Sequence, residues 1–289
     1  MHSLPVSDPA DGEGKKIMQI GRLSIVLSTH AAGFKAVAFK GDFETNLAKI
    51  AGWGYEGVEL AIRDPRLVDK DKLNRALEAH GLKVPAIGTG QAWGEEGLSF
   101  TSVDPDIRRE AVERIKSHIP LAKQLDALVI IGLIRGVTPK GQSHTRSMQF
   151  LSECLRECLE LAAPAGVRLA FEPLNRYETD LINTATQGLD LVERIGSANL
   201  GLLLDTFHMN IEETAIEESI RKCGKQTFHF HVADSNRRYA GGGHIDFKSI
   251  LAALYGTGYL GWVSGEFMPQ PDPDTAAQRN IRYLNKIFS

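Results

Sequence analysis

Cysteine and long apolar runs are both scarce in this chain, and their scarcity excludes several classes of protein. There are 3 cysteines among 289 residues, an odd number without the spacing of a disulfide framework or a zinc ribbon. No apolar run approaches the roughly 20 residues that a membrane helix needs, and the N-terminus lacks the charged-then-apolar pattern of a signal peptide. We therefore expect a soluble protein of the reducing cytoplasm, with no membrane partner.

Charge of one sign is also not in excess. The chain has 33 Lys and Arg against 36 Asp and Glu, a formal net charge of -3. Proteins that bind nucleic acid by neutralising many phosphates need a positive field, which this composition does not provide. Nucleic acid is therefore not an expected partner. Hydrophobic residues make up 43% of the chain, which is close to the globular average and sufficient for a sizeable core.

The first 16 residues differ in composition from the rest. The segment MHSLPVSDPADGEGKK is polar and rich in Gly, Pro and Asp, which is typical of a leader outside a folded domain. No linker or shift in composition divides the remainder. We expect residues 17–289 to form a single domain.

Short β-branched or apolar runs alternate with helical patterns along that domain. The candidate strands are 23–28, 57–60, 83–87, 128–132, 167–172, 201–205, 228–233 and 262–266. The candidate helices are 43–51, 70–80, 107–125, 145–163, 186–195, 247–255 and 274–288. This alternation indicates βα units around a parallel sheet, and (β/α)8 barrels occupy about 250 residues. An open doubly wound sheet is the alternative, but no GxGxxG follows the first strand. The preferred fold class is α/β, a (β/α)8 TIM barrel.

Four late strands carry polar residues at the point where each strand ends. Catalytic groups of such barrels project from the C-terminal strand ends, and inward positions alternate with positions that face the helices. In VRLAFEP, GLLLD, FHFHVAD and WVSGE, this alternation places Glu172, Asp205, His231 and Glu266 on the inner rim, and Phe228 outward. Three carboxylates and an imidazole would repel one another or be costly to bury without a cation. Oxygen ligands with one His suit Mn²⁺, Mg²⁺ or Co²⁺, so one divalent metal ion is predicted.

Polar clusters in the loops after these strands predict substrate contacts. Glu178 lies in EPLNRYE, His208 in DTFHMNIEE and Arg237 in HVADSNRR. Loops at this end of a barrel grip the substrate, and hydroxyl-binding groups are expected there in a sugar enzyme.

Three further charged residues allow more than one interpretation. Arg135, in IIGLIRG after the strand at 128–132, could fork onto a substrate carboxylate or phosphate, or pair with an acid of a loop. Glu212 and Glu213, at the end of DTFHMNIEE, could bind substrate hydroxyls, but the favoured interpretation is acids in the first turn of a helix, where they complement its dipole.

The segments EPLNRYE, LLDTFHMNIEE, HFHVADSNR and the closing GE, in this order, resemble the D-tagatose 3-epimerase and D-psicose 3-epimerase family of the xylose isomerase-like TIM barrels. The resemblance runs from about residue 23 to the C-terminus, and it loosens after Arg237, where RYAGGGHIDF replaces a proline-containing loop that ends in Trp. It implies that Glu172 and Glu266 are both metal ligands and proton-transfer groups, with Asp205 and His231 completing the metal set. It also assigns the three loop residues named above to the substrate's oxygens.

These residues predict a metal-dependent epimerase that inverts C3 of a ketose or a related keto-sugar, including acidic or phosphorylated ones, through an enediolate. Two carboxylates on opposite faces of the planar intermediate would invert the carbon, whereas one shuttling base would interconvert aldose and ketose. The alternatives are an aldose-ketose or hydroxypyruvate-type isomerase and a non-enzymatic sugar-binding protein. A multi-zinc endonuclease is disfavoured because it needs more histidines at strand ends. A manganese ion and a homo-oligomer, dimeric or tetrameric, are expected.

Overall fold

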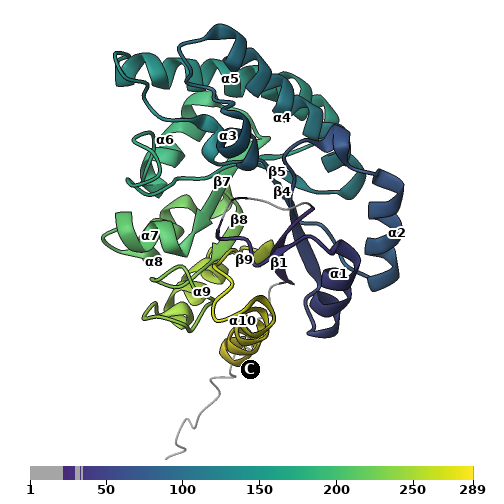
Figure 1. The fold of residues 1–289 in the computed structure, drawn as a ribbon. Coiled ribbons are helices and arrows are strands. Elements are labelled where there is room, and N and C mark those ends of the chain that lie inside the picture. The colour runs from purple at the N-terminus through teal and green to yellow at the C-terminus, as the bar shows by residue number, and fades with distance from the viewer. Residues whose placement is uncertain (1–21, 30–32, 34, 289) are drawn as a thin grey trace, which may run out of the picture.

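The computed structural model describes residues 22–29, 33 and 35–288, which form a closed parallel barrel ringed by helices (Figure 1). The barrel strands are β1 (Arg22–Ser28), β3 (Gly57–Ala61), β4 (Ala86–Gly88), β5 (Leu128–Ile131), β6 (Leu169–Phe171), β7 (Leu200–Asp205), β8 (Thr227–Val232) and β9 (Trp262–Gly265). A two-residue strand, β2 (Phe39–Lys40), also pairs with β1. Because β1 pairs with both β3 and β9, the ring closes and the predicted fold class is confirmed. The expected leader, residues 1–16, lies outside the described residues.

The seven predicted helices are present with small changes at their ends. They are α1 (Phe43–Gly52), α2 (Lys70–His80), α4 (Pro105–Leu125), α5 (His144–Ala165), α6 (Ala185–Ile195), α9 (Phe247–Gly256) and α10 (Pro273–Phe288). Three further helices were not predicted: α3 (Gln91–Glu96), α7 (Thr206–Glu212) and α8 (Ile216–Cys223). At six to eight residues, these are too short to show a clear helical period. Short 3-10 turns, η1 (Pro65–Leu67), η2 (Leu133–Arg135) and η3 (Gly224–Gln226), complete the connections.

Side chains and glycines at the helix ends explain where several helices start and stop. The Asp104 carboxylate accepts the N–H of Asp106 at the start of α4. Thr184 and Gln187 form a reciprocal capping box at the start of α6. Gly166, in the left-handed region, ends α5. These local signals fix the ends of the helices that connect the strands. Because the strands are parallel, their C-terminal ends all lie at the same rim.

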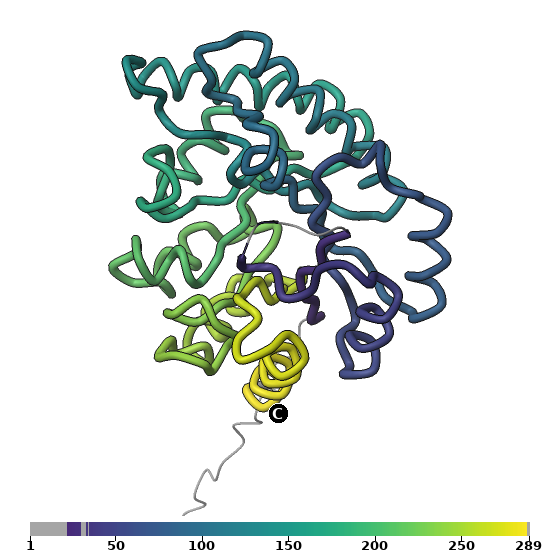
Figure 2. The backbone as a smooth tube through the Cα atoms, in the orientation of Figure 1, coloured from purple at the N-terminus to yellow at the C-terminus, as the bar shows by residue number. Residues whose placement is uncertain are grey.

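The last helix of the chain packs beside the first helix, on the outside of the closed barrel. Figure 2 follows the chain around the barrel until α10 returns to the region of α1. Lys49 of α1 and Asp274 of α10 form an ion pair at 2.8 Å, and the hydroxyl of Tyr55 donates to the carbonyl of Ala277. Within the described part of the chain, none of the helices combines the length and apolar character that a membrane crossing requires.

One residue of β8, Phe228, departs from the strict alternation of inward and outward side chains that the sequence predicts. One apolar cluster inside the barrel consists of Ala86, Leu128, Ile130, Ala170 and Leu203. The register between β7 and β8 shifts beside residue 228, and the Phe228 ring packs against this interior cluster. The outward orientation predicted for Phe228 is therefore wrong, because an irregular register breaks the period of two. Gly201 accommodates the ring, since a Cβ at that position would lie 2.5 Å from Phe228.

We expect Gly201→Ala to lower the free energy of unfolding by about 1–3 kcal/mol, because the new methyl group would overpack the barrel interior against Phe228. Gly52→Ala is the matched control, since nothing lies within 4 Å of its added Cβ and Ala is the better helix former. Urea unfolding followed by circular dichroism measures both variants. Equal stabilities for the two variants would contradict this account.

Candidate metal and substrate site

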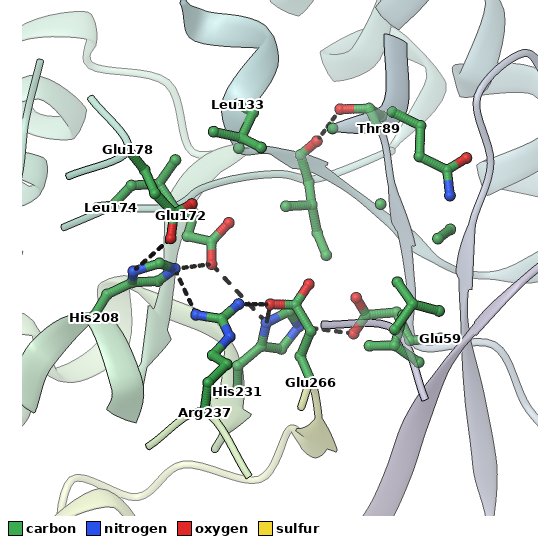
Figure 3. A pocket seen from close by; sticks show the side chains of 18 residues that line it. Glu59, Thr89, Leu133, Glu172, Leu174, Glu178, His208, His231, Arg237 and Glu266 are labelled. Atoms are coloured by element: carbon green, nitrogen blue, oxygen red, sulfur yellow. Dashed lines mark hydrogen bonds and ion pairs between the residues drawn. The ribbon is translucent and has the colours of Figure 1, made fainter. Parts of the chain in front are cut away.

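The four predicted metal ligands meet at the C-terminal rim of the barrel, and Figure 3 shows three of them, Glu172, His231 and Glu266. Asp205 ends β7 and His231 lies in β8, while Glu172 and Glu266 directly follow β6 and β9. The backbone N–H of Glu172 donates to Ile131, so the ladder extends one residue beyond β6 and holds that carboxylate at the rim. One ligand atom from each of the four residues lies within 4.8 Å of the others.

The geometry of the four side chains leaves a polar space between them. His231 Nδ1 lies 4.0 Å from Glu172 Oε1, 3.9 Å from Asp205 Oδ2 and 3.8 Å from Glu266 Oε2. The first three of these atoms are buried and have no hydrogen-bond partner in the described part of the chain. Unpaired buried polar atoms are costly, and a divalent cation among them would satisfy all three. Three carboxylates and one imidazole therefore fit a single divalent ion that prefers oxygen.

Without a bound cation, the burial and the charges at the site favour the protonated forms of its ionisable side chains. Burial raises the pKa of Glu172 well above its ordinary value, and the nearby carboxylates of Glu266 and Asp205 add to the effect. Burial likewise raises the pKa of Glu266, against the neighbouring cationic groups. For His231, burial favours the neutral ring, but the adjacent Glu59 outweighs it and raises the pKa to about 10. The metal-free site therefore holds protons at neutral pH.

We expect Mn²⁺ binding to release protons and to weaken as the pH falls from 8 to 6, because the ligands must lose protons that their raised pKa values retain. Isothermal titration calorimetry in buffers of different ionisation enthalpy measures both the affinity and the protons released. The surface variant Glu157→Gln should bind Mn²⁺ as the unmodified chain does. An affinity that is constant across this range would refute the proton competition.

Asp205 also starts the helix that carries one of the predicted substrate contacts. Its Oδ1 accepts the N–H of Phe207 at the N-terminus of α7, which leaves Oδ2 facing the other ligands. His208, in the first turn of α7, points its Nε2 toward Glu172 Oε1 at 3.7 Å and Asp205 Oδ2 at 3.8 Å. Burial, and then the nearby arginines, hold the pKa of His208 well below its ordinary value, so the ring is neutral.

The other two predicted substrate residues border the same pocket. Arg237 contacts Glu266 through Nη2 and lies 3.5 Å from Asp205 Oδ2, and its guanidinium stacks over the ring of Phe207 at 4.5 Å. Its backbone is in the left-handed region, at φ 59°. Glu178 accepts from the side-chain amide of Asn175 at 3.0 Å and lines the pocket. The sequence placed both in the correct loops.

Arg135 lies close to these carboxylates but does not face the pocket. Its side chain is fully buried, stacks over the ring of Phe171 at 3.9 Å, and donates to the carbonyls of residues 131, 132, 181 and 182. The structure therefore corrects both interpretations of Arg135, because its donors are directed at backbone oxygens, neither at a loop acid nor at the substrate space.

The interpretation of Glu212 and Glu213 as first-turn acids is also wrong. Glu212 is the last residue of α7, where it accepts the backbone N–H of Arg176 at 2.6 Å and pairs with the Arg176 guanidinium at 2.8 Å. Glu213 accepts the N–H of Ala185 at 2.7 Å, at the start of α6. Both acids fasten the loop after β6, which carries Glu178.

Two residues at the site have roles that sequence reasoning missed. Glu59, on β3, is 2% exposed and accepts from His229 Nε2 at 2.8 Å and from His231 Nε2 at 2.9 Å. The sequence signal that could have identified Glu59 was an acid in the middle of the apolar strand GVELA. Gly132 lies directly after β5, and a Cβ there would lie 2.9 Å from Glu172 Oε2. No pattern marks this glycine, because the need for it arises only from the facing strand.

Comparison with known proteins agrees with this geometry. Residues 47–287 match the family model described as xylose isomerase-like TIM barrel. The chain belongs to this family. It is 34% identical over 242 residues to the L-ribulose 3-epimerase of Mesorhizobium japonicum, a match that covers 83% of this chain and 80% of that protein. It is 33% identical over 231 residues to the D-psicose 3-epimerase of Ruminiclostridium cellulolyticum, covering 78% of each.

Solved structures of such epimerases have the same fold. A structure of L-ribulose 3-epimerase aligns with a TM-score of 0.80 at 28% identity, covering 93% of this chain and 95% of that one. D-psicose 3-epimerase from Clostridium cellulolyticum H10, with D-tagatose, aligns with a TM-score of 0.79 at 25% identity, covering 93% and 99%. The resemblance read from the motifs is confirmed, and the chain is an enzyme of the epimerase and isomerase class. The non-enzymatic interpretation is set aside.

Proposed function

We propose that the enzyme is a divalent-metal-dependent epimerase that inverts C3 of a ketose. The observation that carries the proposal is the placement of Glu172 and Glu266, two carboxylates that reach one pocket from the ends of β6 and β9. These strands are not neighbours in the ring. Two such groups can address a planar carbon from opposite sides, which inversion requires and a single base does not provide.

Each group of the site has a definite task in this proposal. Glu172, Asp205, His231 and Glu266 would hold the metal ion, with Mn²⁺ favoured and Mg²⁺ or Co²⁺ as alternatives. The ion, when bound, would supply positive charge that stabilises the negative charge developing on the sugar's oxygens. One of the two glutamates removes the C3 proton to give an enediolate, and the other returns a proton from the opposite face.

The remaining polar side chains orient the sugar. His208, Arg237 and Glu178 line the pocket beside the two glutamates and are suited to hold substrate oxygens. Within the described part of the chain, Arg237 is the one Arg or Lys that lines this pocket, and it already contacts two carboxylates. With Arg135 turned to backbone carbonyls, we favour a neutral ketose over an acidic or phosphorylated sugar. The homo-oligomeric state stays a prediction.

A second candidate is an aldose-ketose or hydroxypyruvate-type isomerase. The chain is 26% identical over 250 residues to the hydroxypyruvate isomerase of Escherichia coli, a match that covers 84% of this chain and 93% of that protein. An isomerase moves a proton between adjacent carbons, so the position of solvent-derived label separates the two activities.

We expect the Mn²⁺-loaded enzyme in D₂O to place deuterium at C3 of L-ribulose or D-psicose, and to form the C3 epimer at the same time. Mass spectrometry and proton NMR locate the label. Deuterium at C1 or C2 with formation of an aldose, or turnover of hydroxypyruvate alone, would establish the isomerase instead.

Glu172→Gln and Glu266→Gln should each reduce epimerisation by at least about 100-fold, because each removes one acid/base group of the pair. Glu157→Gln, on the surface of α5, is the matched control and should retain full turnover. Circular dichroism checks the fold of each variant. Full turnover by either site variant would eliminate the two-base mechanism.

A further inference from the structure

We infer that Glu59 is a positioning residue for the candidate metal centre: by accepting hydrogen bonds from both His231 and His229, it fixes the tautomer and ring orientation of the His231 ligand. This inference rests on the proposed function, because it assigns Glu59 a task toward the proposed ion. Glu59 itself would not contact the ion or the sugar's reacting carbon.

The contacts of a single carboxylate oxygen carry the inference. Glu59 Oε2 lies 2.8 Å from Nε2 of His229 and 2.9 Å from Nε2 of His231, and Figure 3 shows the contact with His231. A carboxyl group is a stronger acid than an imidazolium, so beside two imidazoles the Glu59 oxygen is ionised and accepts a hydrogen bond from both rings. Both histidines therefore carry a proton on Nε2 and direct it at Glu59.

This assignment leaves the other nitrogen of His231 available to the metal site. With one proton held on Nε2, Nδ1 is the nitrogen that faces the three carboxylates, 3.8–4.0 Å away, and its lone pair becomes available to an ion when the ring loses its second proton. Nδ1 has no hydrogen-bond partner in the described part of the chain. Histidines that bind metals usually donate their second N–H to a carboxylate or carbonyl, which sets the tautomer and increases the basicity of the ligand.

The placement of Glu59 makes the contact rigid. Glu59 lies on β3 and the histidines on β8, two strands that do not pair, so the contact crosses the barrel interior. All three side chains are at most 2% exposed. The two imidazole rings pack edge to face, with centroids 5.2 Å apart. His229 thus holds Glu59 from a second direction, and the ring of His231 has little freedom to rotate.

A second cation among Glu59, His229 and His231 is the competing interpretation, since their ligand atoms also lie close enough together. The same atoms are already used by the two hydrogen bonds. A cation there would need both Nε2 atoms without protons. It would also place its charge beside the ion held by Nδ1 of the same ring. We therefore assign the cluster as a hydrogen-bonded support, and the number of ions bound per chain tests this assignment.

The test is direct titration with Mn²⁺, without any sugar. The unmodified chain should bind one ion, Glu59→Gln should bind it about 10-fold more weakly, and Glu59→Leu should approach 100-fold, since Gln keeps an acceptor oxygen that Leu lacks. Glu157→Gln, on the surface, should leave the affinity unchanged. Thermal melts identify any variant that fails to fold, and the near-isosteric Gln variant keeps the test valid if the Leu variant does not fold.

A spectroscopic signature separates positioning from general structural support. In the Mg²⁺-loaded chain with ¹⁵N-labelled histidine, the Nε2–H signals of His229 and His231 should appear downfield and exchange slowly. The His231 signal should move upfield and exchange faster in Glu59→Gln. Any one of three results would overturn the inference. These are a proton on Nδ1 of His231, an unchanged Mn²⁺ affinity in both Glu59 variants, and two ions bound per unmodified chain. No binding of Mn²⁺ by the unmodified chain would refute the proposed function instead.

Discussion

The buried negative charge at the barrel rim is the constraint on which the rest of the site depends. Glu172 and Asp205 are buried and Glu266 is only partly exposed, so the mutual repulsion of the three carboxylates must be balanced. Arg237 and His231 provide part of the balance from within the chain. The proposed ion would provide the remainder. The same crowding raises the pKa of Glu172 and Glu266 in the metal-free site, so an ion that binds there must displace protons from its own ligands.

The sequence predicted the barrel and the meeting of the four candidate metal residues at one rim, because both follow from local patterns. Alternation with a period of two placed Asp205 and His231 on the inner face, and the strand ends placed Glu172 and Glu266 at one rim. Parallel strands whose carboxyl ends meet at one edge bring such residues together without further information. The motifs then related the chain to known epimerases, which the comparisons confirm.

The errors concern features that depend on distant parts of the chain. Phe228 points inward because the register between β7 and β8 shifts. Arg135 points away from the pocket because backbone carbonyls of two separate segments accept hydrogen bonds from its guanidinium. Glu59 gained its significance from histidines that lie 170 residues or more along the chain. A single sequence does not encode these pairings in any local period, so they become visible only when the barrel is closed.

Gly132 matters for the space that it leaves beside Glu172. Because a methyl group there would lie 2.9 Å from Glu172 Oε2, even alanine would displace one of the two proposed proton carriers. The position contributes space and no chemical group. A side chain at position 132 would force the end of the Glu172 side chain to move, so the glycine preserves the space in which that carboxylate faces the other candidate ligands.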